Sequence, residues 1–293
     1  MGTAPPSAGR TLRPLARAAD EFVLTTVLLF LAVTVVRWLR DPGSPLCVAD
    51  LRVALVAIGA ISGAVLTGLI LSPAGRRSGG HTNPAVTVAL WLMNAFPGRH
   101  VLPYVLAQLA GSAAGTGLAR LVWGRAVGFP SVSYAAIRPA PAWQPLPVLI
   151  AEVAGMLGLT LVIAFFVLRP RFVRALAPVI GLSVGVVIAT LGPLSGGSVN
   201  PARQFGPAVL SGQTTDLAIY LLAPVLGAAL GAGIHRVSVR LFLTGSGLRP
   251  APASVPASVP ASVPAGPPAG PGSARDAQAA AVVRQTTEGK RVR

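Results

Sequence analysis

Six long apolar stretches dominate this sequence, and they contain almost no charged residues. They span Phe22–Val36, Val53–Leu71, Val101–Val122, Val148–Leu168, Leu176–Leu191 and Leu217–Phe242. A hydrocarbon core about 30 Å thick is crossed by about twenty helical residues, and each stretch has that length or can be extended to it. Lipid offers the backbone no hydrogen-bond partners, so a continuous apolar stretch that crosses it is expected to be helical. The sequence therefore predicts an all-α membrane protein with six transmembrane helices.

The composition excludes the main alternative, a large soluble helical bundle. Of the 293 residues, 53% are hydrophobic and only 11% are charged, and the mean hydropathy is +0.68. The helices of a soluble bundle need charged outer faces. Only eight residues of the whole chain are acidic, Glu21, Asp50 and Glu152 among them, which is too few for six such faces.

The net charge of +16 suggests nucleic-acid binding, but the arginines cluster between the apolar stretches and at their ends rather than on one stripe. Six crossings put twelve of them on one side: Arg10, Arg13, Arg17, Arg76, Arg77, Arg99, Arg169, Arg171, Arg174, Arg236, Arg240 and Arg249. Six lie on the other side: Arg37, Arg40, Arg52, Arg120, Arg125 and Arg138. By the positive-inside rule both termini are cytoplasmic. We expect a multi-pass protein of a bacterial plasma membrane, embedded in the lipid bilayer, with no nucleic-acid partner.

The chain divides into a membrane domain and two tails. Residues 1–18 are expected to be a cytoplasmic N-terminal tail. Residues 249–293 contain the repeat ASVPASVPASVPAGPPAGPG, which is typical of a disordered cytoplasmic linker. The domain between them, 19–248, has two halves of three spans, at about 19–124 and about 146–245. Because three is odd, the second half must enter the membrane from the opposite side, which makes an inverted repeat.

The two halves share a motif between their second and third spans. The first copy reads SGGHTNPAVTVALWL, from Ser78 to Leu92, and the second reads SGGSVNPARQFGPAVL, from Ser195 to Leu210. After Asn83 the sequence runs apolar to about Trp91, and after Asn200 the corresponding stretch reaches about Leu210 before Ser211 and Gly212. Ten helical residues rise about 15 Å, half the thickness of the membrane. We therefore expect two re-entrant half-helices that begin inside the protein.

Asn-Pro-Ala suits the buried start of a half-helix. The asparagine is a good N-cap because its side-chain oxygen accepts from an orphan backbone N–H, and proline presets the first helical φ. The asparagine NH₂ remains free to donate sideways, and the alanine lets the two copies approach closely. Two positive helix ends would then face one point of a pore. The residues are Asn83, Pro84 and Ala85 in the first copy and Asn200, Pro201 and Ala202 in the second.

With these motifs the chain resembles the major intrinsic protein family, the aquaporins and aquaglyceroporins, over about 19–245. Glu21 and Glu152 resemble the family's paired buried glutamates that brace the re-entrant loops, and YVLAQLAG at Tyr104–Gly111 resembles its third span. The resemblance implies the aquaporin fold and a passive channel for water or small uncharged solutes that excludes ions and protons. It also implies a homotetramer, with no cofactor, no metal and no catalytic residue.

The same resemblance assigns the narrowest point of the pore to Gly63, Ile188, Gly197 and Arg203. Two glycines imply a wide opening, and the histidine of water-selective members is absent. The set is most similar to that of plant nodulin-like intrinsic proteins, which implies glycerol, urea or neutral metalloid acids such as boric acid as solutes. Gln204 and Ala208 depart from the pattern of glycerol facilitators.

Two other function classes stand beside a channel. A weakly conducting membrane scaffold with the same fold is the alternative, and large residues at the constriction would favour it. An enzyme is not expected. The sequence has few polar residues, and they form no Ser/His/Asp set, metal-ligand cluster or phosphate-binding loop.

Overall fold

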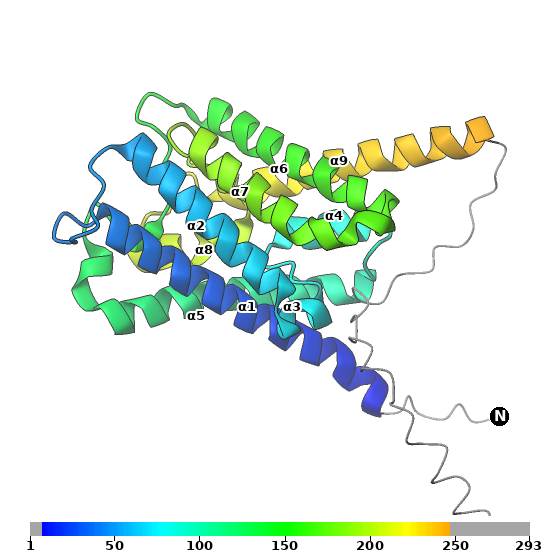
Figure 1. Cartoon of the computed structure of the whole chain (residues 1–293), viewed down its shortest axis with the longest axis horizontal. Helices are drawn as coiled ribbons and strands as arrows, with labels where there is room; N and C mark the ends of the chain where they lie inside the picture. Colours follow the sequence, from blue (N-terminus) through cyan, green and yellow to red (C-terminus); the bar gives the residue numbers. More distant parts are fainter. Residues whose placement is uncertain (1–7, 247–293) are drawn as a thin grey trace, which may run out of the picture. The chain divides into compact units, whose positions relative to one another are not determined.

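The computed structural model describes residues 8–246 and their side chains from 15 to 242 (Figure 1). Every regular element in this part is helical. In chain order the elements are α1 Ala8–Arg40, α2 Leu51–Leu71, α3 Pro73–Ser78, α4 Pro84–Leu92, η1 Gly98–His100, α5 Val101–Trp123, η2 Gly124–Gly128, η3 Ser133–Ala135, α6 Pro145–Leu168, η4 Pro170–Ala175, α7 Leu176–Leu191, α8 Pro201–Ser211 and α9 Leu217–Ser246.

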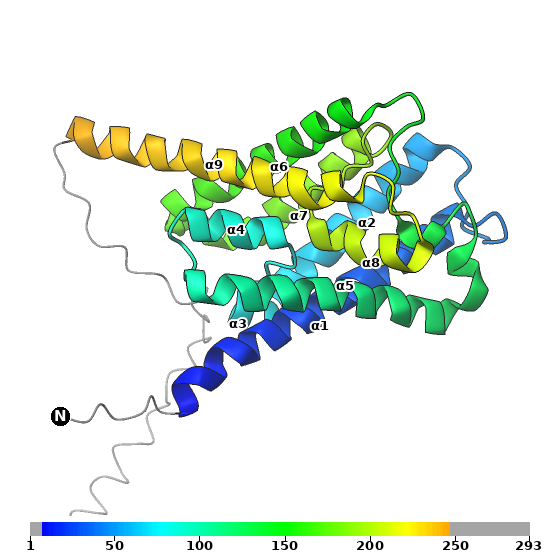
Figure 2. The same ribbon diagram turned by 180° about the vertical axis from the view of Figure 1, so that it is seen from behind.

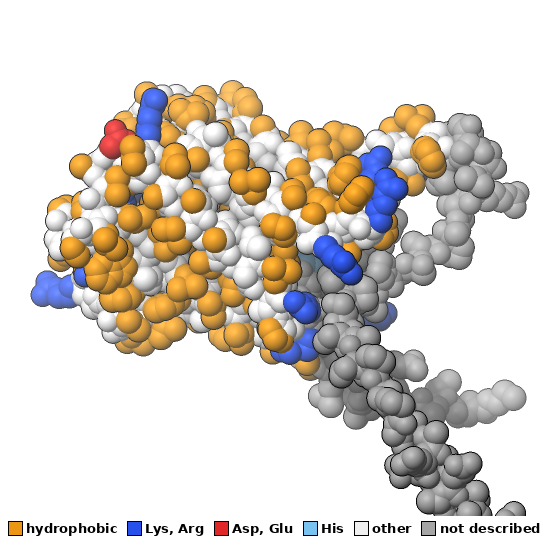
Figure 3. All heavy atoms as spheres, in the orientation of Figure 1, with side chains coloured by type: hydrophobic (Ala, Val, Ile, Leu, Met, Phe, Trp, Pro, Cys, Tyr) orange, Lys and Arg blue, Asp and Glu red, His pale blue; other side chains and the backbone are white. Residues whose placement is uncertain are grey.

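Within residues 8–246, six helices are long and apolar enough to cross a membrane, as the sequence predicts. The candidate spans are Leu15–Arg40, Leu51–Leu71, Gly98–Gly128, Pro145–Leu168, Pro170–Leu191 and Leu217–Phe242. Large apolar side chains cover the outside, and Leu121, Leu182 and Phe242 are each more than 60% exposed to solvent. On the face in Figure 3 arginines lie toward the two ends and the middle is apolar or uncharged. A soluble monomer would not expose such an apolar surface.

The two half-helices are present and have the expected lengths. Helix α4 has nine residues and α8 has eleven, so neither can span the membrane. Figure 2 shows them in line with one another, between α5 and α9. Helix α4 packs mainly against α9 and α8 mainly against α5, so each half-helix is held by the third span of the other half.

Glycine pairs mark the inverted repeat in the packing of the long helices. On α5, a Cβ at Gly111 would lie 2.6 Å from the Phe22 carbonyl oxygen of α1, and Gly115 lies equally close to α1 one turn later. On α9, a Cβ at Gly227 would collide with the Val153 carbonyl oxygen of α6, and one at Gly231 would lie 2.7 Å from the Thr160 side chain. The two pairs are 116 residues apart (227 − 111), close to the 117 that separate the two asparagines. The close approach of small residues lets helices pack tightly in lipid.

Two features differ from the sequence-based expectations. Helix α1 begins at Ala8, so it extends into the segment assigned to the N-terminal tail. A short helix, α3, follows α2 after a break at Ser72, whose hydroxyl accepts from the N–H of Gly75. The proline at position 73 explains the break, because it cannot continue α2. The C-terminal tail 249–293 lies outside the described residues.

Helices α2 and α7 cross at a pair of glycines from each. Gly59 meets the backbone of Gly185, where a Cβ would lie 2.5 Å from the carbonyl oxygen, and Gly63 meets Gly181 one turn along. The hydroxyl of Thr67 donates to the Gly63 carbonyl at 2.9 Å. This crossing joins the two halves of the chain. The two helices approach so closely because the four positions where they meet have no side chain.

We expect Gly63→Ala to destabilise the protein and Gly68→Ala, on the same helix, to leave it as stable or slightly more stable. A methyl group at 63 collides with the Gly181 backbone, whereas nothing lies within 4 Å of a Cβ at 68. Overpacking of this kind costs about 1–3 kcal/mol, while alanine is a better helix former than glycine. Thermal unfolding of the purified protein in detergent measures both variants. Equal melting temperatures would contradict the crossing.

Candidate functional site

Each half-helix starts at an asparagine that caps it. The side-chain Oδ1 of Asn83 accepts from the N–H of Ala85 at 2.8 Å, and that of Asn200 accepts from the N–H of Ala202 at 2.9 Å. Both asparagines have an extended backbone with φ of −152°, and a proline follows as the first helical residue. The motif therefore folds locally as its residue types predict.

The two caps also bind each other's loop. Asn83 Nδ2 donates to the carbonyl oxygen of Val199 at 3.0 Å, and Asn200 Nδ2 donates to that of Thr82 at 3.0 Å. The structure thus brings the two Asn-Pro-Ala motifs together with their N-termini opposed. One N–H of each amide is used in this way, so each asparagine retains a second N–H donor.

The residue before each asparagine has an uncommon backbone conformation. Thr82 has φ of +46° and Val199 has φ of +43°, in the left-handed region that β-branched residues avoid. Strain of this kind costs about 1–3 kcal/mol at each residue. Its effect here is to turn each N–H toward a buried glutamate and each carbonyl toward the opposite asparagine.

The first loop is bound by the carboxylate of Glu21 on α1, which is fully buried. Its Oε1 accepts from the Ser78 hydroxyl at 2.6 Å and from the His81 N–H at 3.0 Å. Its Oε2 accepts from the Thr82 N–H at 2.7 Å and from Gln108 Nε2 at 2.8 Å. A buried carboxylate is tolerated because four donors replace its hydration.

Glu152 on α6 binds the second loop in the same way and is also fully buried. Its Oε1 accepts from the Ser195 hydroxyl at 2.8 Å and from the Ser198 N–H at 3.0 Å. Its Oε2 accepts from the Val199 N–H at 2.7 Å. Each glutamate therefore satisfies backbone donors that lipid cannot satisfy.

Two tyrosines support the same loops, a role that sequence reasoning did not assign to them. Tyr104 of α5 donates its hydroxyl to the Ser78 carbonyl at 2.8 Å, and Tyr220 of α9 donates to the Ser195 carbonyl at 2.5 Å. Both rings are fully buried. The signal was available in the repeat, because 104 and 220 are 116 apart, like the glycine pairs on the same two helices.

Arg203 lies in the first turn of α8, three residues after Asn200, and is half-buried. Its guanidinium NH1 donates to the Ala135 carbonyl at 2.8 Å. Ala135 belongs to the α5–α6 connection, by which we mean residues 124–144. The arginine is thus fixed by a segment that the sequence did not single out.

Gly197 lies in the second loop, with φ of +62°. A Cβ there would lie 2.9 Å from the Val187 carbonyl oxygen and 3.2 Å from the Gly192 N–H nitrogen. Both the backbone conformation and the space around it therefore demand glycine. Ile188 lies on α7, half-buried, in the same helical stripe as Gly181 and Gly185.

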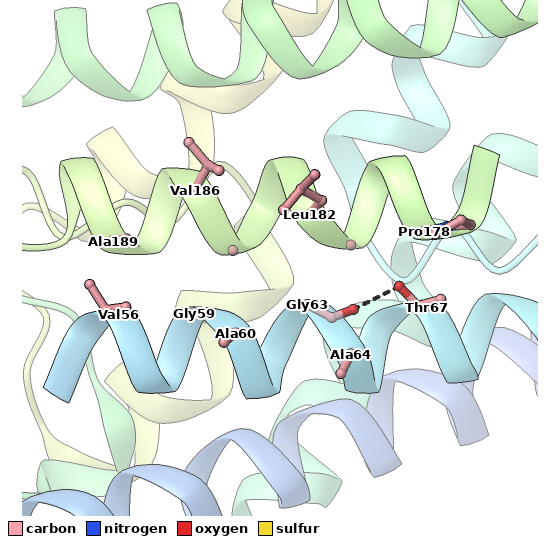
Figure 4. Close-up of a pocket in the computed structure, with 12 residues that line it drawn as sticks. Val56, Gly59, Ala60, Gly63, Ala64, Thr67, Pro178, Leu182, Val186 and Ala189 are labelled. Atoms are coloured by element: carbon pink, nitrogen blue, oxygen red, sulfur yellow. Dashed lines mark hydrogen bonds between the residues drawn. The ribbon is translucent and has the colours of Figure 1, made fainter. Parts of the chain in front are cut away.

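Gly63 requires a correction. We expected its missing side chain to widen the pore, but the direction of a Cβ at this position leads into the Gly181 backbone of α7. Figure 4 shows Gly59 and Gly63 at the contact between α2 and α7. The glycine is explained by helix packing, so we leave it out of the constriction. Spacing along the sequence identified the helix that carries Gly63, but not the direction in which this position points around the helix axis.

No group of three or more histidine, cysteine, aspartate or glutamate residues that could hold a metal ion occurs in the described part of the chain. The groups brought together are amide and guanidinium donors at the starts of two opposed helices. Such an arrangement can bind and orient polar, uncharged molecules, and it makes or breaks no bond.

Comparison with known proteins agrees with this geometry. The sequence matches the family described as Major intrinsic protein over residues 10–235. It is 39% identical over 196 residues to Aquaporin AqpM of Methanothermobacter marburgensis, covering 60% of this chain and 74% of that protein. It is 34% identical over 227 residues to the propanediol uptake facilitator PduF of Citrobacter freundii, covering 65% and 84%. Aquaporin NIP1-1 of Zea mays is 37% identical over 168 residues, 56% of each chain.

Among solved structures, the aquaglyceroporin from Plasmodium falciparum is similar, with a TM-score of 0.67 and 21% sequence identity. The match covers 78% of this chain and 98% of that one. At this identity the likeness shows the fold, an all-helical arrangement with six spans.

We expect Glu21→Gln to destabilise the protein by about 1–3 kcal/mol, because one acceptor becomes an NH₂ that faces other donors. The neighbouring Asp20→Asn is the control. Asp20 pairs with Arg77, whose side chain is 61% exposed, so the loss of this ion pair costs little stability. Thermal unfolding in detergent compares the two. A Glu21→Gln protein as stable as Asp20→Asn would show that the loop does not depend on the carboxylate.

Proposed function

Because this chain belongs to the major intrinsic protein family of channels for water or small neutral solutes, we propose that it passes water, glycerol, urea and neutral metalloid acids such as boric acid. We further propose that it excludes ions and protons. The single observation that carries this proposal is the pair of opposed asparagine amides, each with one N–H committed to the other loop. The chain is a channel and not an enzyme.

The proposed path passes the free N–H groups of Asn83 and Asn200. A solute oxygen accepts from these amides in turn, which compensates for part of the hydration that it loses in a narrow pore. The N-terminal ends of α4 and α8 add a positive potential at the same point. A neutral solute with oxygens is accommodated there, whereas a cation is repelled.

The proposed constriction consists of Ile188, Gly197 and Arg203. Arg203 donates to a solute oxygen and repels cations, Ile188 offers an apolar wall, and Gly197 adds no bulk. This set is similar to that of nodulin-like intrinsic proteins, and it lacks the histidine of water-selective channels. Relatives called AqpM, NIP and PduF, the last a propanediol uptake facilitator, agree with a pore for small alcohols as well as water.

We propose that the protein lies in the plasma membrane of a bacterium with both termini in the cytoplasm. The support is the distribution of the arginines that flank the spans, twelve on the side of the termini against six on the other. Anionic lipids and the insertion machinery both favour arginine-rich connections on the cytoplasmic side.

We also propose that four copies assemble. Helices α2 and α7 lie on the face seen in Figure 1. Between them is a groove of about 440 Å³, floored by their crossing glycines. Its rim residues Val56, Leu182 and Val186 are more than half exposed. A second copy that covers this groove would bury them, and the family's homotetramer provides one.

Native mass spectrometry of the full-length protein, released from detergent, tests the assembly. The expected species is a tetramer of the 29.7 kDa chain. A protein that is monomeric at every detergent concentration that keeps it folded would contradict the proposal.

The function itself is tested by stopped-flow light scattering on proteoliposomes. Water, glycerol, urea and boric acid are measured side by side against empty liposomes. We expect higher fluxes for water and for at least one of the other three solutes. Fluxes equal to those of empty liposomes for all four would favour the scaffold alternative, and a water flux alone would overturn the proposed solutes.

We expect Arg203→Ala to raise the leak of monovalent cations by at least about tenfold, which corresponds to a barrier lowered by about 1.4 kcal/mol. One electrostatic barrier is lost, while the glutamates and asparagines still hold the loops. The control is Arg125→Ala, an exposed arginine in η2. The leak is read from the decay of a potassium gradient. An unchanged leak in Arg203→Ala would remove this arginine from the constriction.

A further inference from the structure

Gln204 is a buried residue that has no role in the proposed solute path. It follows Arg203 on α8, and its side chain is completely buried. The Ile137 N–H donates to Gln204 Oε1 at 2.8 Å, and Gln204 Nε2 donates to the Ile137 carbonyl at 2.9 Å. One side chain thus binds both polar groups of a single residue in the α5–α6 connection.

The side chain of Ile137 is fixed as well. It packs in a buried cluster with Val148 and Tyr220. It also lies directly over Gly196, where any Cβ would collide with the isoleucine side chain. The backbone of Ile137 is therefore hydrogen-bonded to a residue of α8, and its side chain packs against the second re-entrant loop.

The segment just before Ile137 has an unfavourable backbone. Ser133, Tyr134 and Ala135 have φ of +45°, +54° and +60°, three consecutive non-glycine residues in the left-handed region. Each costs about 1–2 kcal/mol, so such a segment persists only where its surroundings hold it. The carbonyl at its end, that of Ala135, accepts from the Arg203 guanidinium at 2.8 Å.

We propose that Gln204 is a positioning residue of the constriction. Its amide holds the Ile137 backbone through two hydrogen bonds, which we call the clamp. The clamp keeps the Ala135 carbonyl, at the end of the strained segment, hydrogen-bonded to Arg203. This inference rests on the proposed function, because it assigns Arg203 to solute selection. The Ala135 carbonyl then fixes one edge of the Arg203 guanidinium and leaves its other N–H groups for a solute. Without the clamp the connection relaxes, the carbonyl withdraws, and the guanidinium samples several orientations.

The chemistry of the site explains why the residue is glutamine. The backbone of Ile137 presents one donor and one acceptor, and a carboxamide offers the complementary acceptor and donor. An ionised glutamate would offer acceptors only and would leave the Ile137 carbonyl unpaired in a buried place. Leucine offers neither group. A clamp of this geometry therefore requires an amide with the length of glutamine.

Hydrogen exchange measures the clamp without any transport assay. We compare Gln204→Leu with Gln213→Leu, the same replacement in the loop after α8, in the full-length protein in detergent. Peptides that cover residues 133–138 should exchange about threefold to tenfold faster in Gln204→Leu, as expected for the loss of a hydrogen bond. Gln213→Leu should match the unmodified protein. If Gln204→Leu does not fold, the unbranched Gln204→Met replaces it in the same comparison.

A double-mutant cycle measures whether the clamp acts through Arg203. In proteoliposomes, Gln204→Leu should change the ratio of urea to glycerol permeability by about threefold or more, the effect of one hydrogen bond on a barrier. In an Arg203→Ala background the same substitution should change the ratio no further, because the group that it positions is gone. Gln213→Leu should leave the ratio unchanged in both backgrounds.

The outcomes separate this inference from the proposed function. Unchanged exchange at 133–138 in Gln204→Leu overturns the clamp, whatever the fluxes are. The positioning role is overturned if exchange is faster but the ratio of urea to glycerol permeability does not change. It is also overturned if Gln204→Leu changes that ratio equally in the Arg203→Ala background. Gln204 would then be a stabilising contact only. If the unmodified protein passes none of the solutes, the proposed function fails, and the positioning role fails with it while exchange still decides the clamp.

Discussion

The two buried carboxylates are the interaction on which the rest of the structure depends. A re-entrant loop brings backbone N–H groups to a depth where lipid and apolar side chains cannot accept from them. Glu21 and Glu152 accept from these groups, and each also accepts from the loop's first serine. Carboxylate and loop stabilise each other, since an isolated buried charge and an unpaired buried backbone group are both unfavourable.

The proposed pore chemistry depends on that support. With the loops fixed, Thr82 and Val199 present their carbonyls across the molecule, and the opposite asparagines donate to them. Each amide is oriented by its own helix through Oδ1 and by the other half of the chain through Nδ2. The remaining N–H groups are therefore preorganised, and under the proposed function they would bind a solute without rearrangement at each passage.

The sequence predicted the features that depend on local rules and missed those that depend on contacts between distant segments. Apolar length gave the spans, and the N-cap preference of Asn83 and Asn200 gave the half-helices. The rotation of Gly63 about α2 depends on the crossing with α7, which no local pattern encodes. The carbonyl of Ala135 reaches Arg203 through a strained, non-glycine segment, whose conformation has no signature in its residue types.

The central claim is that two opposed helix starts and their amides conduct neutral molecules while they exclude protons. Its most direct test is the simultaneous measurement of water and proton flux in proteoliposomes of the unmodified protein, with a pH-sensitive dye enclosed and light scattering recorded. The account predicts a water flux well above that of empty liposomes and a proton flux equal to theirs. Proton conductance that rises with protein content in step with the water flux would contradict it.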